Sequence, residues 1–163
     1  MIPTTKCSKV MSIIGGLFLV LSIALSISEA EQYNAKDQEI GQDGNCIAYA
    51  CGVVWDTMAK LEWVVGPEKD TTWDEAKSWG DNLTVAGGGW RMPTIDELKS
   101  LYDKGRGTRN ITPLLKIGGW AVWSGDIRDS SSAWFFHLDL GKRYWGPSNS
   151  STDIRAFAVR SRK

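Results

Sequence analysis

The pattern of apolar and polar positions predicts a helix of about three turns in the middle of the chain. In the segment GGGWRMPTIDELKSLYDKG, Thr94 and Glu97 have the spacing of a capping box, in which each side chain bonds the backbone N–H of the other. Gly105 is the expected left-handed stop. The apolar positions between them recur at helical spacing and are Ile95, Leu98, Leu101 and Tyr102.

A second capping box predicts an earlier helix. It consists of Thr72 and Glu75, and the helix is expected to run to about Leu83. We interpret Trp73 and Trp79 as core residues of this helix. Its buried stripe is predicted to contain Trp73, Ala76, Trp79 or Gly80, and Leu83.

Apolar runs with the period of β-strands flank the two helices. Residues 53–55 and 61–65, with a polar stretch between them, predict a hairpin. Residues 133–140 give the clearest strand, with Trp134, Phe136, Leu138 and Leu140 on one face and Phe135, His137 and Asp139 on the other. Further strands are expected at 121–124, at about 143–145 and at 155–160, with polar loops at 125–132 and 146–153. Early helices and late strands predict an α+β domain with a mainly antiparallel sheet.

The first 30 residues have the organisation of a secretory signal peptide. Lys6 and Lys9 precede an apolar run over 10–27, and Ser28-Glu29-Ala30 fits a cleavage site. The alternative is an uncleaved membrane anchor, which would be the chain's only contact with a membrane. We therefore expect export, to the periplasm or the extracellular space, with a polar leader over 31–51 and one domain over 52–163.

Two cysteines, Cys46 and Cys51, lie in the predicted leader. In an oxidising compartment we expect a local disulfide that closes a small loop. The alternatives are free or intermolecular thiols. A metal site would need more ligands, and the redox spacing Cys-x-x-Cys is absent from the sequence.

Composition narrows the classes of partner. The chain of 163 residues carries a formal net charge of zero, which gives no electrostatic case for binding nucleic acid or anionic membranes. Nine tryptophans lie between Trp55 and Trp145, more than a small core needs. We expect some of them to be exposed and to serve flat faces of a ligand or partner.

The sequence lacks the motifs of common enzyme classes. It has no glycine-rich phosphate loop, no nucleophile elbow, no zinc-protease motif and a single histidine, His137. We therefore expect no catalytic residues, no metal and no cofactor; a calcium ion has no motif to support it. An enzyme would require Asp126 and Asp139 to converge with His137 in one cleft.

The motif around Trp90 carries a family resemblance. The residues Trp90, Arg91, Pro93, Thr94 and Glu97 fit the pattern WR-[LM]-P-T-x-x-E-L-x-x-L. Further matches are a Val-Val-Trp-Asp opening, Leu61-Glu62-Trp63, a Thr-Trp-Asp-Glu-Ala helix start, Trp123-Ser124 and a closing Arg-Ala-Phe-Ala-Val-Arg. Over about residues 52–160 the chain resembles the secreted bacterial family named for the C-terminal domain of the collagen-like adhesin Lcl.

The resemblance implies a C-type lectin-like fold, distantly similar to formylglycine-generating enzymes, with two helices flanking the sheet and long late loops. Enzyme activity is not carried over, because both mature cysteines precede the domain. The calcium-binding sugar motifs Glu-Pro-Asn and Gln-Pro-Asp are absent. Arg91 has two readings. It either binds an anion or, as we expect, bonds backbone carbonyls and a helix-start carboxylate such as Asp96.

These observations lead to the hypothesis of a secreted, non-catalytic module that binds a glycan or another surface polymer. Tyr144 and Trp145 would stack on a sugar face, and polar side chains of the late loops would bond its rim. The alternative is a protein–protein interaction module of an envelope assembly. The predicted ligand-binding residues are Asp126, Arg128, Arg143, Tyr144, Trp145 and Asn149.

Overall fold

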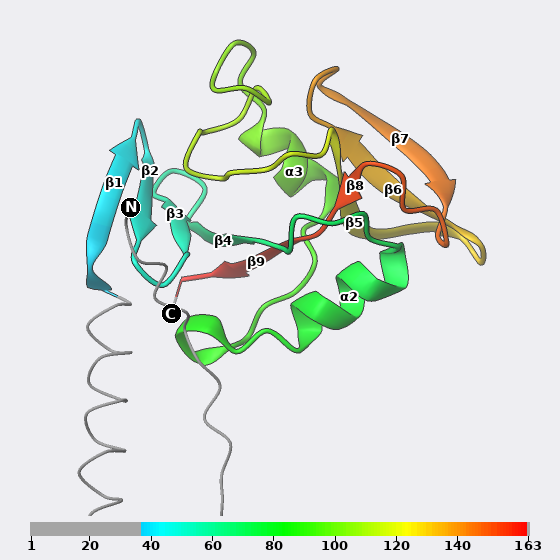
Figure 1. Ribbon diagram of the computed structural model, residues 1–163, viewed down its shortest axis with the longest axis horizontal. Coiled ribbons are helices and arrows are strands. Elements are labelled where there is room, and N and C mark those ends of the chain that lie inside the picture. Colours follow the sequence, from blue (N-terminus) through cyan, green and yellow to red (C-terminus); the bar gives the residue numbers. More distant parts are fainter. Residues whose placement is uncertain (1–36, 163) are drawn as a thin grey trace, which may run out of the picture.

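Two β-sheets and two α-helices make up the described part of the computed structural model, residues 37–162 (Figure 1). The five-stranded sheet has the order β1-β2-β3-β4-β9, and the four-stranded sheet has the order β7-β6-β5-β8. Every pair of neighbours is antiparallel except β5 with β8. The predicted α+β class with a mainly antiparallel sheet is therefore confirmed.

The strand bounds are as follows. In the first sheet they are β1 (Glu39–Asp43), β2 (Cys46–Tyr49), β3 (Val54–Asp56), β4 (Leu61–Val65) and β9 (Phe157–Ser161). In the second sheet they are β5 (Ala121–Asp129), β6 (Ser132–His137), β7 (Lys142–Pro147) and β8 (Ile154–Arg155).

The first helix, α2 (Trp73–Asp81), begins at the predicted capping box. Glu75 accepts from the backbone N–H of Thr72 at 2.8 Å, and the Thr72 hydroxyl accepts from that of Glu75 at 3.4 Å. Ala76 and Gly80 are buried. A short 3-10 turn, η1 (Val85–Gly87), follows the helix.

The second helix, α3 (Ile95–Leu101), also begins at its predicted capping box, formed by Thr94 and Glu97. It is shorter than expected, because Tyr102 has an extended backbone and forms the C-cap. Gly105 has a positive φ of 89° but lies beyond the helix end, so it is not the stop that the sequence predicted.

The main core lies between the five-stranded sheet and α3, and both helices are visible on opposite sides of the sheets in Figure 1. Trp63 of β4 is fully buried there and meets Phe157 of β9 edge to face at 6.4 Å. Leu98 of α3 and Phe136 of β6, a strand of the second sheet, also belong to this core. A second cluster joins α2 to the four-stranded sheet and includes Ala76 and Trp123.

The expected disulfide is absent: Cys46 and Cys51 are not bonded to one another. Cys46 belongs to the main core, whereas Cys51 packs with Tyr49 and Val53 in the cluster on the other face of the same sheet. Strand β2 carries Cys46 toward one face, and the chain passes to the other face before Cys51. Burial raises the pKa of the Cys46 thiol, and the nearby Asp56 carboxylate raises it further.

Three other segments differ from the expectations. The predicted polar leader contributes β1 and β2 to the five-stranded sheet from residue 39 onward. The predicted loop at 125–132 is largely strand, because β5 continues through irregular pairing with β6 as far as Asp129. Strand β6 ends at His137, and Leu140 is 54% exposed rather than on the buried face.

The predicted signal peptide and the residues as far as 36 lie outside the described part of the chain. Within residues 37–162, no helix is both long and apolar enough to cross a membrane.

Candidate functional site

The register of the four-stranded sheet decides where the predicted ligand-binding residues lie. On β7, alternate side chains point to opposite faces of the sheet. Arg143 lies opposite Phe136 and Trp145 lies opposite Trp134, on the face toward α3. Tyr144 lies opposite Phe135, on the other face.

Four side chains on the face toward α3 form two cation–π contacts. We call Arg128, Trp134, Arg143 and Trp145 the Arg–Trp face. The guanidinium carbon of Arg128 lies 3.3 Å from the centroid of the Trp145 ring, and that of Arg143 lies 4.9 Å from the Trp134 ring. Trp145 is 51% exposed. The sheet therefore presents two guanidinium groups stacked on two indoles at the molecular surface.

The two arginines of this face lack a salt bridge. Six of the eight arginines of the chain have a carboxylate oxygen within 4.0 Å, and within the described residues Arg128 and Arg143 are the two that do not. The acid nearest to Arg128 in sequence is Asp129, which accepts from the backbone N–H of Ser131 at 3.0 Å. This hydrogen bond is the main reason why the pKa of Asp129 is lowered, and the charge of Arg128 contributes least.

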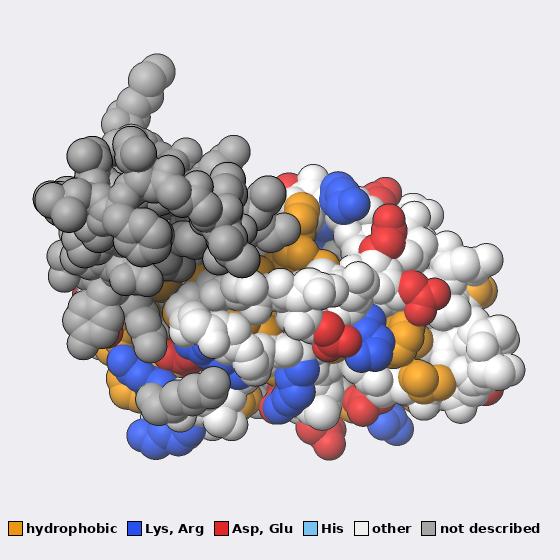
Figure 2. All heavy atoms as spheres, turned by 90° about the horizontal axis from the view of Figure 1, so that it is seen from below, with side chains coloured by type: hydrophobic (Ala, Val, Ile, Leu, Met, Phe, Trp, Pro, Cys, Tyr) orange, Lys and Arg blue, Asp and Glu red, His pale blue; other side chains and the backbone are white. Residues whose placement is uncertain are grey.

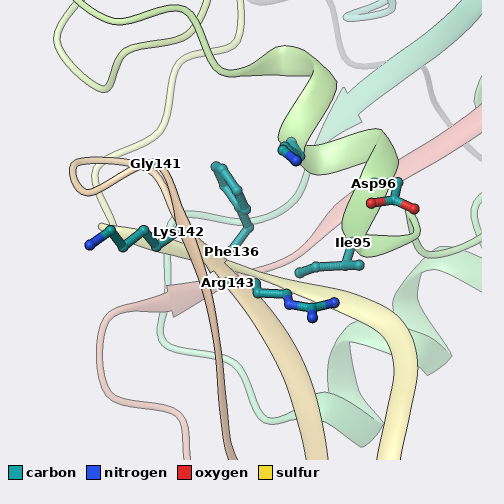
Figure 3. A pocket seen from close by; sticks show the side chains of 7 residues that line it. Ile95, Asp96, Phe136, Gly141, Lys142 and Arg143 are labelled. Atoms are coloured by element: carbon teal, nitrogen blue, oxygen red, sulfur yellow. The ribbon is translucent and has the colours of Figure 1, made fainter.

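A groove of about 490 Å³ runs beside this face, between α3 and the β6–β7 hairpin. Figure 3 shows Phe136 pointing toward α3 and Arg143 lying beneath Ile95, at the mouth of the groove. The lining includes two further cations, Lys99 and Lys142, and one carboxylate, Asp96. Figure 3 also shows the side chain of Lys142 extending away from Arg143. Of these two neighbouring cations on β7, Arg143 is the one that lies beside α3.

Tyr144 is separated from Arg143 and Trp145 by the thickness of the sheet. It stacks on Phe135 with ring centroids 6.0 Å apart and meets His137 edge to face at 6.2 Å. Asn149 is exposed in the connection between β7 and β8. The structure thus brings three of the six predicted residues together, Arg128, Arg143 and Trp145.

Asp126 makes a contact within the protein that the sequence did not predict. Its Oδ2 atom accepts from the backbone N–H of Ile95 at 2.7 Å, at the first residue of α3. Its own backbone N–H donates to the Ser124 hydroxyl at 3.2 Å. The carboxylate therefore satisfies an orphan donor of α3 and complements the positive end of the helix.

The three groups that an enzyme would need to bring together are engaged in separate places. Asp126 caps α3, and Asp139 forms an ion pair with Arg109 at 3.0 Å. His137 lies between the rings of Trp120 and Tyr144, on the face of β6 that points away from α3. Residues 37–162 also contain no group of three or more histidine, cysteine or acidic side chains arranged to hold a metal ion.

A known protein family matches most of the described residues. The family model described as the Lcl C-terminal domain matches residues 52–160. The chain belongs to the Lcl C-terminal domain family. A comparison with curated proteins gave no match for this chain.

In this Lcl C-terminal domain, the residues of the Trp90 motif hold the entry to α3 in place. The Trp90 indole is buried and donates to the carbonyl of Val85 at 2.8 Å. Arg91 forms a double hydrogen bond to Glu97, at 2.6 and 2.8 Å, and also donates to the carbonyl of Met92. The predicted structural role of Arg91 agrees with these bonds, although the carboxylate is Glu97 rather than Asp96.

The environment of Glu97 favours its charged form. Burial by itself raises the pKa of Glu97, but the hydrogen bond from Arg91, the backbone N–H of Thr94 and the charge of Arg91 outweigh burial and lower it. Because this carboxylate serves the capping box and the arginine together, the motif residues support α3 and are not part of the Arg–Trp face.

Sequence reasoning missed Trp134 as a member of the Arg–Trp face of this Lcl C-terminal domain. The signal was present: Gly141 marks a turn, and pairing the flanking strands across that turn sets Trp134 beside Trp145. Trp120, which is 49% exposed, was also missed, because it precedes its strand and has no periodic pattern to place it.

Proposed function

We propose that this Lcl C-terminal domain is a non-catalytic binding module whose ligand is a negatively charged glycan or a similar surface polymer. The observation that carries the proposal is the pair Arg128 and Arg143. Each lies over the ring of a tryptophan on one sheet face, and within residues 37–162 each lacks the carboxylate partner that the other six arginines have.

Stacking leaves the hydrogen-bonding edge of a guanidinium available. An indole covers the flat face of the ion, while the N–H groups point outward in the plane of the ion. Such an edge binds the oxygens of a carboxylate, sulfate or phosphate in a two-pronged fashion. The indoles also restrict the arginine rotamers, so less side-chain entropy is lost when a ligand binds.

The charge of the remaining surface indicates that binding would depend on contacts at the Arg–Trp face itself. The chain carries no net charge, and basic and acidic side chains are interspersed on the face shown in Figure 2. Long-range attraction of an anionic polymer by the whole molecule is therefore weak, and the Arg–Trp face and its groove must supply the contacts. A repeating polymer suits such a surface, because several weak contacts add along its length.

The experiment compares dextran sulfate with uncharged dextran, which share one backbone. Binding of each to the full chain is measured by biolayer interferometry at several salt concentrations. We expect dextran sulfate to bind and dextran to bind far more weakly. We expect Arg128→Ala and Arg143→Ala each to weaken dextran sulfate binding by roughly tenfold, the effect of about 1.4 kcal/mol.

Two control variants separate charge at this face from charge in general. Lys69→Ala removes an exposed cation on the connection between β4 and α2 and should leave the affinity unchanged. Arg143→Lys keeps the charge but not the flat guanidinium, so it should recover part of the loss. Equal binding of dextran and dextran sulfate, or equal loss in the Lys69 and Arg143 variants, would contradict the proposal.

A protein partner is the second candidate. Strand β7 is at the edge of its sheet, so one side of its backbone is unpaired within the described residues. It carries the exposed Tyr144 and Trp145. A partner strand could add to this edge. This reading predicts binding that is insensitive to Arg128→Ala and abolished by a proline substitution at a β7 residue whose N–H points outward.

Export and the finer fold assignment belong to the same proposal. The predicted signal peptide supports a periplasmic or extracellular protein, and the α+β architecture supports a C-type lectin-like fold. We propose a role in adhesion that needs no cofactor.

A further inference from the structure

A second hollow lies on the opposite face of the four-stranded sheet from the Arg–Trp face. It has a volume of about 310 Å³ and opens between the sheet and the connection that follows β7. We call it the aromatic pocket and define it by three ring-bearing and three polar side chains. They are Trp120, Phe135, His137, Ser150, Thr152 and Asp153; Trp145 and Gly146 of β7 also border the hollow, at the edge of the sheet.

One wall of the aromatic pocket is a row of rings. Trp120 lies 6.4 Å from His137 between ring centroids, at an interplanar angle of 35°. His137 in turn contacts Tyr144, which stacks on Phe135. Trp120 and Tyr144 are 49% and 39% exposed, so flat aromatic surface remains uncovered on this side of the sheet.

The other wall is polar, and its side chains are not used by the protein. The side chains of Ser150, Thr152 and Asp153 make no hydrogen bond or ion pair with any residue in the described range 37–162. The Nδ1 atom of His137 is buried and likewise lacks a partner there. Three hydrogen-bonding side chains thus face aromatic surface across a small cavity.

Main-chain hydrogen bonds hold the two walls together. The carbonyl of Asp153 accepts from the backbone N–H groups of Trp120 and Ala121, at 3.2 and 3.4 Å. The connection is also tied at its start, where Ser148 donates to the carbonyl of Ser131 at 2.9 Å and accepts from Trp73 at 2.9 Å. The pocket is therefore formed before a ligand arrives, which lowers the entropic cost of binding.

The geometry points to a neutral pyranose ring as the ligand of the aromatic pocket. A pyranose has an apolar C–H face that stacks on an indole and hydroxyl groups around its edge that bond a carboxylate and hydroxyls. A volume of about 310 Å³ is at the small end for ligand sites and suits one sugar residue.

Charge distinguishes this ligand from the one proposed for the Arg–Trp face. The one acidic side chain in the lining of the aromatic pocket is Asp153, and its carboxylate disfavours anionic sugars. A quaternary ammonium ion would also suit aromatic rings beside a carboxylate. It has no hydroxyl to engage Ser150 and Thr152, so the polar wall favours the sugar.

The test titrates the full chain with the methyl glycosides of glucose, galactose, mannose and N-acetylglucosamine, followed by ¹H–¹⁵N NMR. The nine tryptophans each give an indole N–H signal, and Trp120→Ala assigns the signal of Trp120 by its disappearance. We expect saturable shifts of the Trp120 signal with at least one glycoside. Because these are uncharged ligands, the dissociation constant should not change with salt.

Two substitutions test the pocket without disturbing the core. Trp120→Ala removes a half-exposed ring and should weaken binding at least tenfold, followed through backbone amide signals of the pocket. Asp153 has a positive φ of 56°, which asparagine tolerates well, so Asp153→Asn removes the charge while keeping the backbone. We expect a loss of similar size in this second variant.

Several outcomes would overturn the inference. They are no saturable shift with any of the four glycosides, unchanged affinity in both variants, or saturation by choline chloride instead. Arg143→Ala separates this inference from the proposed function: it should weaken dextran sulfate binding by roughly tenfold and leave the glycoside dissociation constant unchanged. Loss of both activities in Arg143→Ala would contradict a separate neutral-sugar site.

Discussion

Replacing Asp126 by alanine tests whether this residue serves the ligand or the helix. The sequence placed Asp126 among the ligand-binding residues, whereas its carboxylate accepts from the backbone N–H of Ile95 at 2.7 Å. The capping box of α3 satisfies the N–H of Glu97 but not that of Ile95. Asp126→Ala therefore leaves a donor of the first turn without its partner.

The magnitude follows from the hydrogen bond and the helix dipole. A hydrogen bond to a charged acceptor is worth about 1.5–3 kcal/mol, and an acidic group at a helix N-terminus about 0.3–1 kcal/mol. Asp126 and Ile95 are both partly exposed, so water replaces part of the lost bond. We expect a loss of about 1–2 kcal/mol, which for a domain of this size lowers Tm by roughly 4–8 °C.

The assay measures urea and thermal unfolding of the full chain together with dextran sulfate binding. Asp126→Asn is the matched control, because its amide oxygen can still accept from Ile95 while the charge is removed. We expect it to cost less than 1 kcal/mol. If Asp126→Ala keeps its stability but loses polymer binding, the assignment of Asp126 to the helix is wrong.

Three further predictions concern the same fold. Hydrogen bonds and the charge of Arg91 lower the pKa of Glu97, so the ionised carboxylate stabilises the fold above its usual pKa of 4.5, and this contribution is lost as the pH falls further. We expect Glu97→Gln to cost about 0.5–1 kcal/mol at pH 7. In urea titrations at pH 3 the difference in stability between the wild type and Glu97→Gln should be smaller. Gly141→Ala should cost about 2–3 kcal/mol in unfolding experiments, because φ is 62° and a Cβ would lie 2.5 Å from the ring of Tyr102. Gly105→Ala has a positive φ but open space around it, so it should cost about 1 kcal/mol. Equal losses in the two variants would contradict the steric argument. Cys46, buried and with a raised pKa, should react with a thiol reagent at neutral pH only after unfolding. Peptide mapping locates the label among the three cysteines, and rapid labelling of Cys46 in the native chain would contradict this prediction.

Local chemistry explains which elements could be predicted from the sequence. Both capping boxes lie where the pattern placed them, because Thr72 and Thr94 satisfy backbone N–H groups only a few residues away. The alternation in β6 was also sufficient to put Phe136 on the buried face and His137 on the other. These features depend on contacts within one segment, and the sequence contains all of them.

The helix ends and the extent of β5 depend on contacts that the sequence pattern does not contain. Tyr102 leaves the helix and lies against Gly141, far along the chain. The polar segment after Ser124 remains a strand because β6 pairs with it as far as Asp129. In both cases a partner distant in sequence outweighs local propensity.

The candidate site is where tertiary structure decided most. From the sequence alone, Arg143, Tyr144 and Trp145 were one binding group, and Asp126 belonged with them. Strand pairing separates them, because neighbouring residues on β7 point to opposite faces and only the register with β6 says which face carries Trp134.

The same reasoning applies to the cysteines and to the two proposed sites. The sequence determined that Cys46 and Cys51 are close along the chain, but the sheet between their side chains keeps them apart. The sequence likewise determined that the chain has more tryptophan than its core requires. Only the pairing of β5, β6 and β7 decided that Trp145 meets an arginine while Trp120 meets a histidine, because a strand fixes what its side chains contact through its neighbours in the sheet.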